Sequence, residues 1–341
     1  MVVAGAQSLE TALRNSVFQG TVLGPPLWNV YYADAKVAVR KFNFTETVFA
    51  DDFNCWTSFD KDAKEFDVVL QLSLCQHHLH AWGRANQVIF DPKKEEFVLI
   101  RRFRGLGPDF KLLGVTFDPQ LLMHKGVRTI AVEVGWRLST LLRPRRYFTT
   151  PELMRLYKAH VLSFIESGVS GYFHAAASVL DGIDRVQRRF LRELGMSDED
   201  ALLHFRLAPL QLRRQIGILG FLHRINLGQA TQQMTDLFPQ VGRRASTTHV
   251  NLRATFHDKQ LYERVDAHST DQFRRSIFGM VECYNALPQS FVVAKTVKQF
   301  QGDLQRAVMK RVSEGFDGWR EIFSVGRRYA SVLRFQAFFE R

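Results

Sequence analysis

The chain has few cysteines, no long apolar run and no excess of acidic residues, and each absence excludes a class of protein. Its 341 residues include only Cys55, Cys75 and Cys283, too few for a disulfide framework at this length, which indicates a reducing compartment. No apolar run approaches the roughly 20 residues that span a bilayer, and the first residues lack the basic and apolar regions of a signal peptide. We therefore expect a soluble, intracellular protein that does not enter a membrane.

The composition is that of a folded protein with a polyanionic partner. Hydrophobic residues make up 46 % of the chain and aromatic residues 12 %, which favours a sizeable core over disorder. At this length we expect two domains. The formal net charge of +12 points to nucleic acid first and to an anionic membrane surface second. The alternative is a basic surface without a partner.

Residues 46–57 have the pattern of a β-hairpin with two adjacent carboxylates at its tip. β-branched and aromatic residues flank Asp51 and Asp52 on both sides, as strands prefer, and Asp-Asp suits a turn. Two neighbouring carboxylates beside apolar residues repel each other unless a cation lies on them. Magnesium prefers such oxygen ligands and keeps waters and substrate phosphates as its other ligands. The alternative interpretation is an exposed turn that contains two Asp by chance.

Helices and strands are predicted around this hairpin. Residues 19–28 form a loop punctuated by Gly and Pro, followed by a helix that starts at a proline and extends to Asp34. Apolar spacing predicts an amphipathic helix over 68–82 with Cys75 in the core. Strands are predicted at 97–100 and 110–117. Together with the hairpin they would form an antiparallel sheet backed by helices, an α+β fold.

From about residue 125 the pattern becomes helical. The segment 150–152, Thr-Pro-Glu, is a strong helix start. A later helix has a cap-like Ser178 with Asp181 at its start and Gly195 at its end. A stripe of one charge favours contact with a phosphate backbone, although a solvated face is the alternative. The outward face of this helix carries such a stripe, formed by Arg185, Arg188, Arg189 and Arg192.

Four sequence signals occur in a fixed order, and each alone is weak. They are Gln19-Gly20-x-x-Leu23-Gly24-Pro25, Phe49-Ala50-Asp51-Asp52, the lysines before Glu95-Glu96-Phe97, and Leu112-Leu113-Gly114-Val115. Their order and spacing resemble the palm domain of reverse transcriptases, most closely those of non-LTR retrotransposons of the LINE type (jockey-like). The segments 273–276 and 284–288 also look like the C-terminal end of these reading frames, so the resemblance covers most of residues 15–310.

The resemblance implies an RNA-directed DNA polymerase, which adds dNTPs to a primer 3′ end with the help of two magnesium ions. Asp51 matches the principal metal-binding carboxylate of the family, and Asp52 matches its neighbour. Lys94 matches the lysine that assists the leaving pyrophosphate; Lys93 is the alternative, since an alignment without gaps cannot decide between them.

The resemblance also implies contacts with an RNA template, a DNA primer and a dNTP. Gln19 and Gly20 match a loop beside the nascent base pair and the template, where glycine allows close approach. Leu113 and Gly114 match a hairpin that grips the primer terminus. The arginine stripe at 185–192 would lie on the thumb and hold the template–primer duplex by its phosphates, without sequence preference.

The domain organisation implied by the resemblance is a partial right-hand polymerase. Residues 1–122 would be a partial palm, residues 123–228 a helical thumb and connection, residues 229–270 a linker or irregular segment, and residues 271–341 a helical C-terminal region. The fingers and the endonuclease, which precede this part in the family, would be missing.

The chain departs from the family in its metal ligands. These polymerases carry a further metal-binding Asp on a strand before the Gln-Gly loop, and none of the eighteen residues before Gln19 is Asp. Asp34 follows the loop and cannot replace it, and Trp28 stands where the family usually has Phe. Because one bridging carboxylate would be missing, we expect the chain alone to be inactive as a polymerase. The alternative is a non-catalytic remnant or domesticated protein that binds RNA or RNA–DNA duplex.

Overall fold

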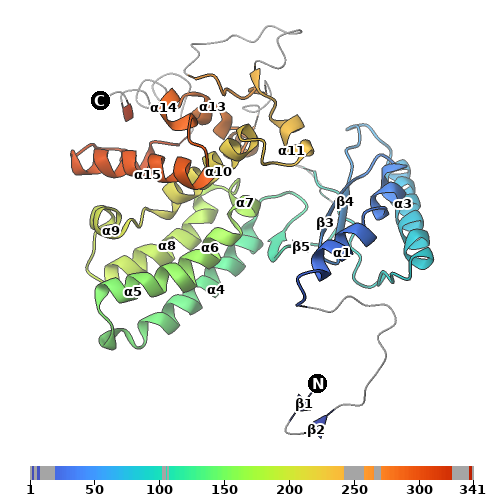
Figure 1. Cartoon of the computed structure of the whole chain (residues 1–341), viewed down its shortest axis with the longest axis horizontal. Coiled ribbons are helices and arrows are strands. Elements are labelled where there is room, and N and C mark those ends of the chain that lie inside the picture. Colours follow the sequence, from blue (N-terminus) through green and yellow to red (C-terminus); the bar gives the residue numbers. More distant parts are fainter. Residues whose placement is uncertain are drawn as a thin grey trace. The chain divides into compact units, whose positions relative to one another are not determined.

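The chain folds into two compact units, unit 1 in Met1–Phe97 and unit 2 in Val98–Arg341 (Figure 1). The computed structural model describes residues 2–3, 6–7, 20–101, 105, 107–241, 257–264, 270–324 and 338–339. The boundary between the units falls inside the segment 1–122 that resembles a palm. The palm and thumb boundaries therefore stay predictions.

Unit 1 contains, among its described residues, two strand pairs and three helices, the last of which is the longest. Its described elements are β1 (Val2–Val3), β2 (Ala6–Gln7), α1 (Gly24–Tyr31), α2 (Ala35–Arg40), β3 (Thr45–Phe49), β4 (Asp52–Trp56) and α3 (Glu65–Ala85). The predicted hairpin and amphipathic helix are confirmed, and Cys75 is buried in a small core with Val39 and Phe44. The predicted extension of the first helix to Asp34 is wrong. Asp34 instead precedes α2, and its carboxylate accepts a hydrogen bond from the Trp82 indole at 3.1 Å, which fixes the break.

The described strands form separate two-stranded hairpins, not the single antiparallel sheet that the pattern predicts. Residues 97–100 contain one β-bridge, at Leu99, and no strand. Residues 110–117 are two strands, β5 (Phe110–Leu112) and β6 (Val115–Phe117). The chain reverses between them because Leu113 and Gly114 both have positive φ, +46° and +87°, which closes a two-residue turn. The mixed α and β character with antiparallel pairing is confirmed.

Unit 2 is helical from residue 124 onward, as the pattern predicts for the described residues. No helix among them is long and apolar enough to cross a membrane. One helix, α11, lies in the segment predicted as a linker. The α-helices are α4 (His124–Leu142), α5 (Thr150–Tyr157), α6 (Ser163–Ser167), α7 (Val169–Tyr172), α8 (Ala177–Glu193), α9 (Asp198–Phe205), α10 (Leu210–Asn226), α11 (Gln232–Leu237), α12 (Asp271–Arg275), α13 (Met280–Asn285), α14 (Gln289–Val292) and α15 (Val297–Ser313).

Shorter turns of helix complete unit 2. They are the 3₁₀-helices at Arg145–Tyr147 and Trp319–Glu321 and a π-helical turn at Lys158–Leu162, which continues α5.

Two helix starts differ in detail from the sequence prediction. α5 begins as predicted, but the capping residue is Thr149, whose backbone N–H donates to the Glu152 carboxylate at 2.8 Å. The predicted cap at Ser178 is wrong, because α8 already starts at Ala177, after the extended residue Ala176. Gly195 ends α8 as predicted, with φ +61° and its N–H bonded to the Arg192 carbonyl at 3.1 Å.

A first hydrophobic core joins α4, α5 and α8. Its centre is the stacked pair Tyr157 and Phe190, with ring centroids 4.2 Å apart and planes 6° from parallel. Val134 and Leu138 of α4 are fully buried in the same cluster. Both α5 and α8 thus turn one apolar face to this core.

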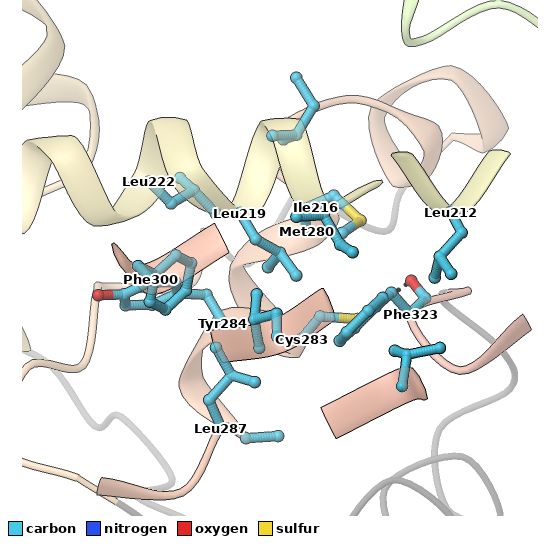
Figure 2. Packing of buried hydrophobic residues seen from close by; sticks show 14 of the residues in the cluster. Leu212, Ile216, Leu219, Leu222, Met280, Cys283, Tyr284, Leu287, Phe300 and Phe323 are labelled. Carbon is cyan, nitrogen blue, oxygen red and sulfur yellow. Dashed lines mark hydrogen bonds between the residues drawn. The ribbon is translucent and has the colours of Figure 1, made fainter. Parts of the chain in front are cut away.

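A second core surrounds α10 (Figure 2). Leu219 and Leu222 of this helix lie in one buried cluster with Tyr284 of α13 and Phe300 of α15. The Cys283 thiol, next to Tyr284, donates to the Phe323 carbonyl at 3.5 Å. This core brings together segments separated by more than a hundred residues, and burial raises the pKa of the Cys283 thiol to about 12.

The start of α4 passes so close to β6 that only glycine fits at position 126. A Cβ at Gly126 would lie 2.1 Å from the Thr116 carbonyl oxygen, whereas one at Gly135 in the same helix would meet nothing within 4 Å. Gly126→Ala should therefore destabilise the protein by about 1–3 kcal/mol through overpacking. Gly135→Ala should stabilise it by up to about 1 kcal/mol through helix propensity. Urea unfolding midpoints of the two variants test this, and equal shifts would contradict the close approach.

Candidate functional site

The tip of the β3–β4 hairpin carries the two carboxylates on a strained turn. Phe49 pairs with Asp52, so Ala50 and Asp51 alone form the turn. Ala50 adopts φ +54°, which a residue with a Cβ rarely takes and which costs about 1–2 kcal/mol. The side chains of Asp51 and Asp52 are both exposed. Strain of this kind persists only where the surroundings hold it in place.

A cluster of three aromatic side chains, Trp28, Tyr32 and Trp82, supports the turn through one hydrogen bond. The Trp28 indole of α1 donates a hydrogen bond to the Ala50 carbonyl at 2.7 Å. Trp28 stacks on the buried Tyr32, with ring centroids 5.0 Å apart, and Trp82 of α3 meets Tyr32 edge-on at 5.2 Å. The indole donor explains the departure at position 28: a Phe there could not make this bond.

The charge of Asp51 reaches this aromatic cluster. The pKa of Tyr32 is raised to about 12, first by burial of the phenol and second by the nearby negative charge of Asp51. The phenol therefore stays neutral at physiological pH. A cation on Asp51 would weaken the part of the pKa shift that comes from its charge.

The pair Asp51 and Asp52 fits part of a magnesium site. Exposed carboxylate oxygens are the ligands that magnesium prefers, and the open tip leaves room for waters and phosphates. In the part of the chain that the structure describes, no group of three or more His, Cys, Asp or Glu side chains gathers as metal ligands.

The structure does not bring the candidate lysines into contact with this pair. Lys93 and Lys94 lie in an exposed turn, where the Lys93 N–H donates to the Asp91 carboxylate at 3.0 Å. The next residue, Glu95, ties the turn to α3 by accepting hydrogen bonds from Gln76 and from the His80 ring at 2.5 Å each. The choice between Lys93 and Lys94 stays open.

The resemblance also matches Gln19, Gly20, Leu113 and Gly114 to contacts with the template and primer, and the structure describes all of them but Gln19. Gln19 lies outside the described residues, and Gly20 is exposed with φ +85°. Leu113 and Gly114 form the tip of the β5–β6 hairpin in unit 2, where Leu113 is 58 % exposed. An exposed leucine at the tip of a tight turn is available for contact with a ligand.

Part of the arginine stripe on α8 is neutralised. All four arginines are exposed, but Arg185 and Arg188 both pair with Asp181, at 3.1 and 2.6 Å. Arg188 lowers the pKa of the Asp181 carboxyl by its hydrogen bond. Arg189 reaches only the Ser139 hydroxyl at 3.4 Å, and Arg192 has no carboxylate partner among the described residues. The free positive charge thus concentrates at the C-terminal half of the stripe.

Further arginines at the end of α4 extend the C-terminal half of the α8 stripe. They are not among the residues predicted from the sequence. The Arg189–Ser139 bond and an ion pair between Arg145 and Glu193 join the last turns of α4 and the following 3₁₀-helix to α8. We define the α4–α8 basic patch as Arg143, Arg146, Tyr147, Arg189 and Arg192. Its arginines have no carboxylate partner among the described residues, and Arg146 lies over the exposed Tyr147 ring at 4.7 Å. The signal was available in the run Arg-Pro-Arg-Arg-Tyr-Phe at 143–148.

Comparisons of the chain with family models, with curated proteins and with solved structures found no match.

The link between Asp51 and Tyr32 gives a prediction that separates the two carboxylates. Asp51→Asn should lower the pKa of Tyr32 from about 12, because a neutral amide no longer opposes the phenolate. Asp52→Asn should leave it unchanged. The Tyr32 ring signal in a ¹³C NMR pH titration, assigned with Tyr32→Phe, reports the shift. Equal shifts in both variants would mean that Asp51 is not the carboxylate over the aromatic cluster.

Proposed function

We propose that this chain is the palm and thumb portion of a reverse transcriptase of the non-LTR retrotransposon kind, an RNA-directed DNA polymerase. The observation that carries the proposal is the hairpin tip. It presents Asp51 and Asp52 to solvent on a turn strained at Ala50 and held by Trp28. Positive φ is what a two-residue hairpin turn requires, so the feature that favours a site over a chance turn is the hydrogen bond by which Trp28, a residue of another element, supports the Ala50 carbonyl.

The roles of the residues follow from this placement. Magnesium bound to Asp51 and Asp52 would stabilise the charge that develops as a primer 3′ oxygen attacks the phosphate of a dNTP. The strand pairing of the hairpin fixes the backbone positions of the two carboxylates. Tyr32 of the aromatic cluster lies close enough to Asp51 to feel its charge, and it stays neutral. Lys94, or Lys93, would meet the negative charge of the leaving pyrophosphate.

The expectation that this chain alone does not polymerise rests on the resemblance, in which a further metal-binding Asp precedes the Gln-Gly loop. A two-ion site needs carboxylates that bridge both ions. Metal binding at the tip and polymerisation by the chain are therefore separate questions.

Metal binding at the tip can be tested with Mn²⁺ as a paramagnetic substitute for magnesium. Added Mn²⁺ should broaden the backbone amide signals of residues 50–53, and Asp51→Asn combined with Asp52→Asn should abolish the effect. Asp60→Asn is the matched control, because Asp60 is also exposed and follows the same hairpin. Broadening that persists without both tip carboxylates would refute a metal site at this position.

Primer extension tests the activity of the chain. On an RNA template with a DNA primer, dNTPs and Mg²⁺ or Mn²⁺, we expect no extended product from these 341 residues. Extension by the unaltered chain that is lost in Asp51→Asn would contradict the expectation of inactivity. The same result would support the assignment as a polymerase.

A second candidate function, binding of an RNA–DNA duplex without catalysis, is favoured by the α4–α8 basic patch. Four arginines without carboxylate partners and an exposed tyrosine combine phosphate contacts with a ring on which a base can stack. This function needs neither a complete metal site nor any catalytic carboxylate. It is what a decayed or domesticated remnant would retain.

The salt dependence of duplex binding tests this second function. Affinity for a template–primer duplex should fall with rising salt, and Arg189→Gln with Arg192→Gln should reduce the slope of log K against log salt by roughly 2, about 1 for each lost phosphate contact. Arg185→Gln is the matched control on the same helix and should change the slope less, because Asp181 already pairs with Arg185. Affinity that is independent of salt would exclude phosphate binding.

A further inference from the structure

Two of the three cysteines lie in unit 1 and meet in its small core. Cys75 of α3 is buried there with Val39 and Phe44. Cys55 of β4 is half-buried and packs against this cluster. The third cysteine, Cys283, lies in the core of unit 2. Neither function proposed above uses the two thiols of unit 1.

The backbone directs both thiols into this core. Alternate residues of a strand face the same side, and Phe53 and Cys55 of β4 both pack against the core. Residues spaced by three and four share one face of a helix. On α3 that face is formed by Leu72, Cys75 and Leu79, which all belong to the same cluster. The two thiols therefore approach each other from elements packed on one core.

Each of these thiols is the largest influence on the pKa of the other. The pKa of Cys55 is lowered, first by a hydrogen bond with the Cys75 side chain. The pKa of Cys75 is raised, first by the same interaction and second by burial. A hydrogen bond to the charged form favours that form, so Cys55 holds the thiolate of the pair. Thiols that interact directly meet the first condition for a disulfide, which is proximity.

The two thiols also differ in exposure, as a stepwise oxidation requires. Cys55 is half-buried, so a small oxidant can reach the residue that supplies thiolate. Cys75 is 3 % exposed and stays a neutral thiol beside it. Cysteines that respond to oxidants commonly have such a second thiol next to them. Cys283 has neither feature: it is buried, its pKa is raised, and its thiol donates to the Phe323 carbonyl.

We propose that Cys55 and Cys75 form a reversible disulfide when hydrogen peroxide is present. The Cys55 thiolate attacks one peroxide oxygen, the O–O bond breaks, and the other oxygen leaves as hydroxide and becomes water by taking up a proton. The Cys75 sulfur then attacks the sulfenic acid formed on Cys55. The S–S bond forms as the S–O bond breaks, and the hydroxyl leaves as water with the proton of the Cys75 thiol. Two electrons thus pass from the two thiols to the peroxide.

The disulfide tethers the hairpin to α3. β4 leads away from the tip that carries Asp51 and Asp52, and α3 supplies Trp82 to the aromatic cluster under the same tip. A bond between β4 and α3 therefore restrains the tip and its support together. In a reducing compartment, thiol reductants break the bond again. This modification depends on neither function proposed above, because it needs no metal at the tip and no nucleic acid.

Peptide mapping of the full, unaltered chain tests the proposal. The dilute protein is treated with hydrogen peroxide, the remaining thiols are alkylated, and the chain is digested with trypsin without reductant. The peptides 42–61 and 65–84, which contain Cys55 and Cys75, should be recovered as one disulfide-linked species that dithiothreitol separates. The peptide 276–295, which contains Cys283, should be recovered alkylated. Absence of the linked species, or oxidation of Cys283 first, would overturn the proposal.

Two controls separate the folded geometry from mere closeness in the sequence. In concentrated urea the link should form at least about tenfold more slowly, because the unfolded chain must close the loop by chance and Cys55 loses the bond that favours its thiolate. An equal rate in urea would overturn the proposal. Cys283→Ser should form the link at the unaltered rate. In Cys75→Ser, dimedone, which labels sulfenic acids, should mark Cys55, and labelling of Cys283 instead would contradict the proposed order.

Hydrogen exchange tests the tether itself. On oxidation, amide exchange in β4 and α3 should slow at least about tenfold, because the disulfide removes conformations from the locally unfolded state. The same treatment of Cys55→Ser should leave these rates unchanged. A linked chain whose amides in β4 and α3 exchange as fast as before would show that the bond does not restrain the hairpin.

Discussion

The buried ion pair between Arg214 and Asp184 is the interaction on which the helical unit depends. Arg214 is nearly inaccessible and donates to both Asp184 oxygens, at 2.6 and 2.8 Å. A buried guanidinium left without its carboxylate costs about 3–5 kcal/mol, so α10 must meet α8 in this register. That register joins the core around Tyr157 and Phe190 to the core around Tyr284 and Phe300. The two helices also line a cavity of about 420 Å³ together with α12.

The hairpin tip obeys a different constraint, backbone strain. Trp28 of α1, stacked on Tyr32 just after that helix, supports a turn that Ala50 alone would not favour. The support comes from a unit whose fully buried core is small. The strain lies on Ala50 alone, and it lets the chain reverse in two residues so that Asp51 and Asp52 are exposed at the tip.

Positive charge is distributed unequally over unit 2. Asp181 neutralises the start of the α8 stripe, while the end of the stripe joins Arg143 and Arg146 in a patch without carboxylates among the described residues. Around the cavity, Asp184, Asp181 and Asp271 pair with Arg214, Arg188 and Arg274. The unpaired positive charge of α8 thus lies at its C-terminal end, in the open α4–α8 basic patch.

The sequence by itself determined the local features. Strand propensity fixed the hairpin around Asp51, apolar spacing placed Cys75 in the core, and Gly195 ended its helix, because each depends on neighbours within a few residues. The turn at Leu113 and Gly114 and the pairing of Asp181 with Arg185 and Arg188 are also local, so the sequence contains them although its strand and stripe patterns did not predict them. Tertiary structure alone decided that no strand from elsewhere joins the β5–β6 hairpin among the described residues, that Arg189 reaches Ser139 of α4, and that Arg214 pairs with Asp184. Those outcomes depend on contacts between residues far apart in the chain, and local spacing carries no information about such contacts.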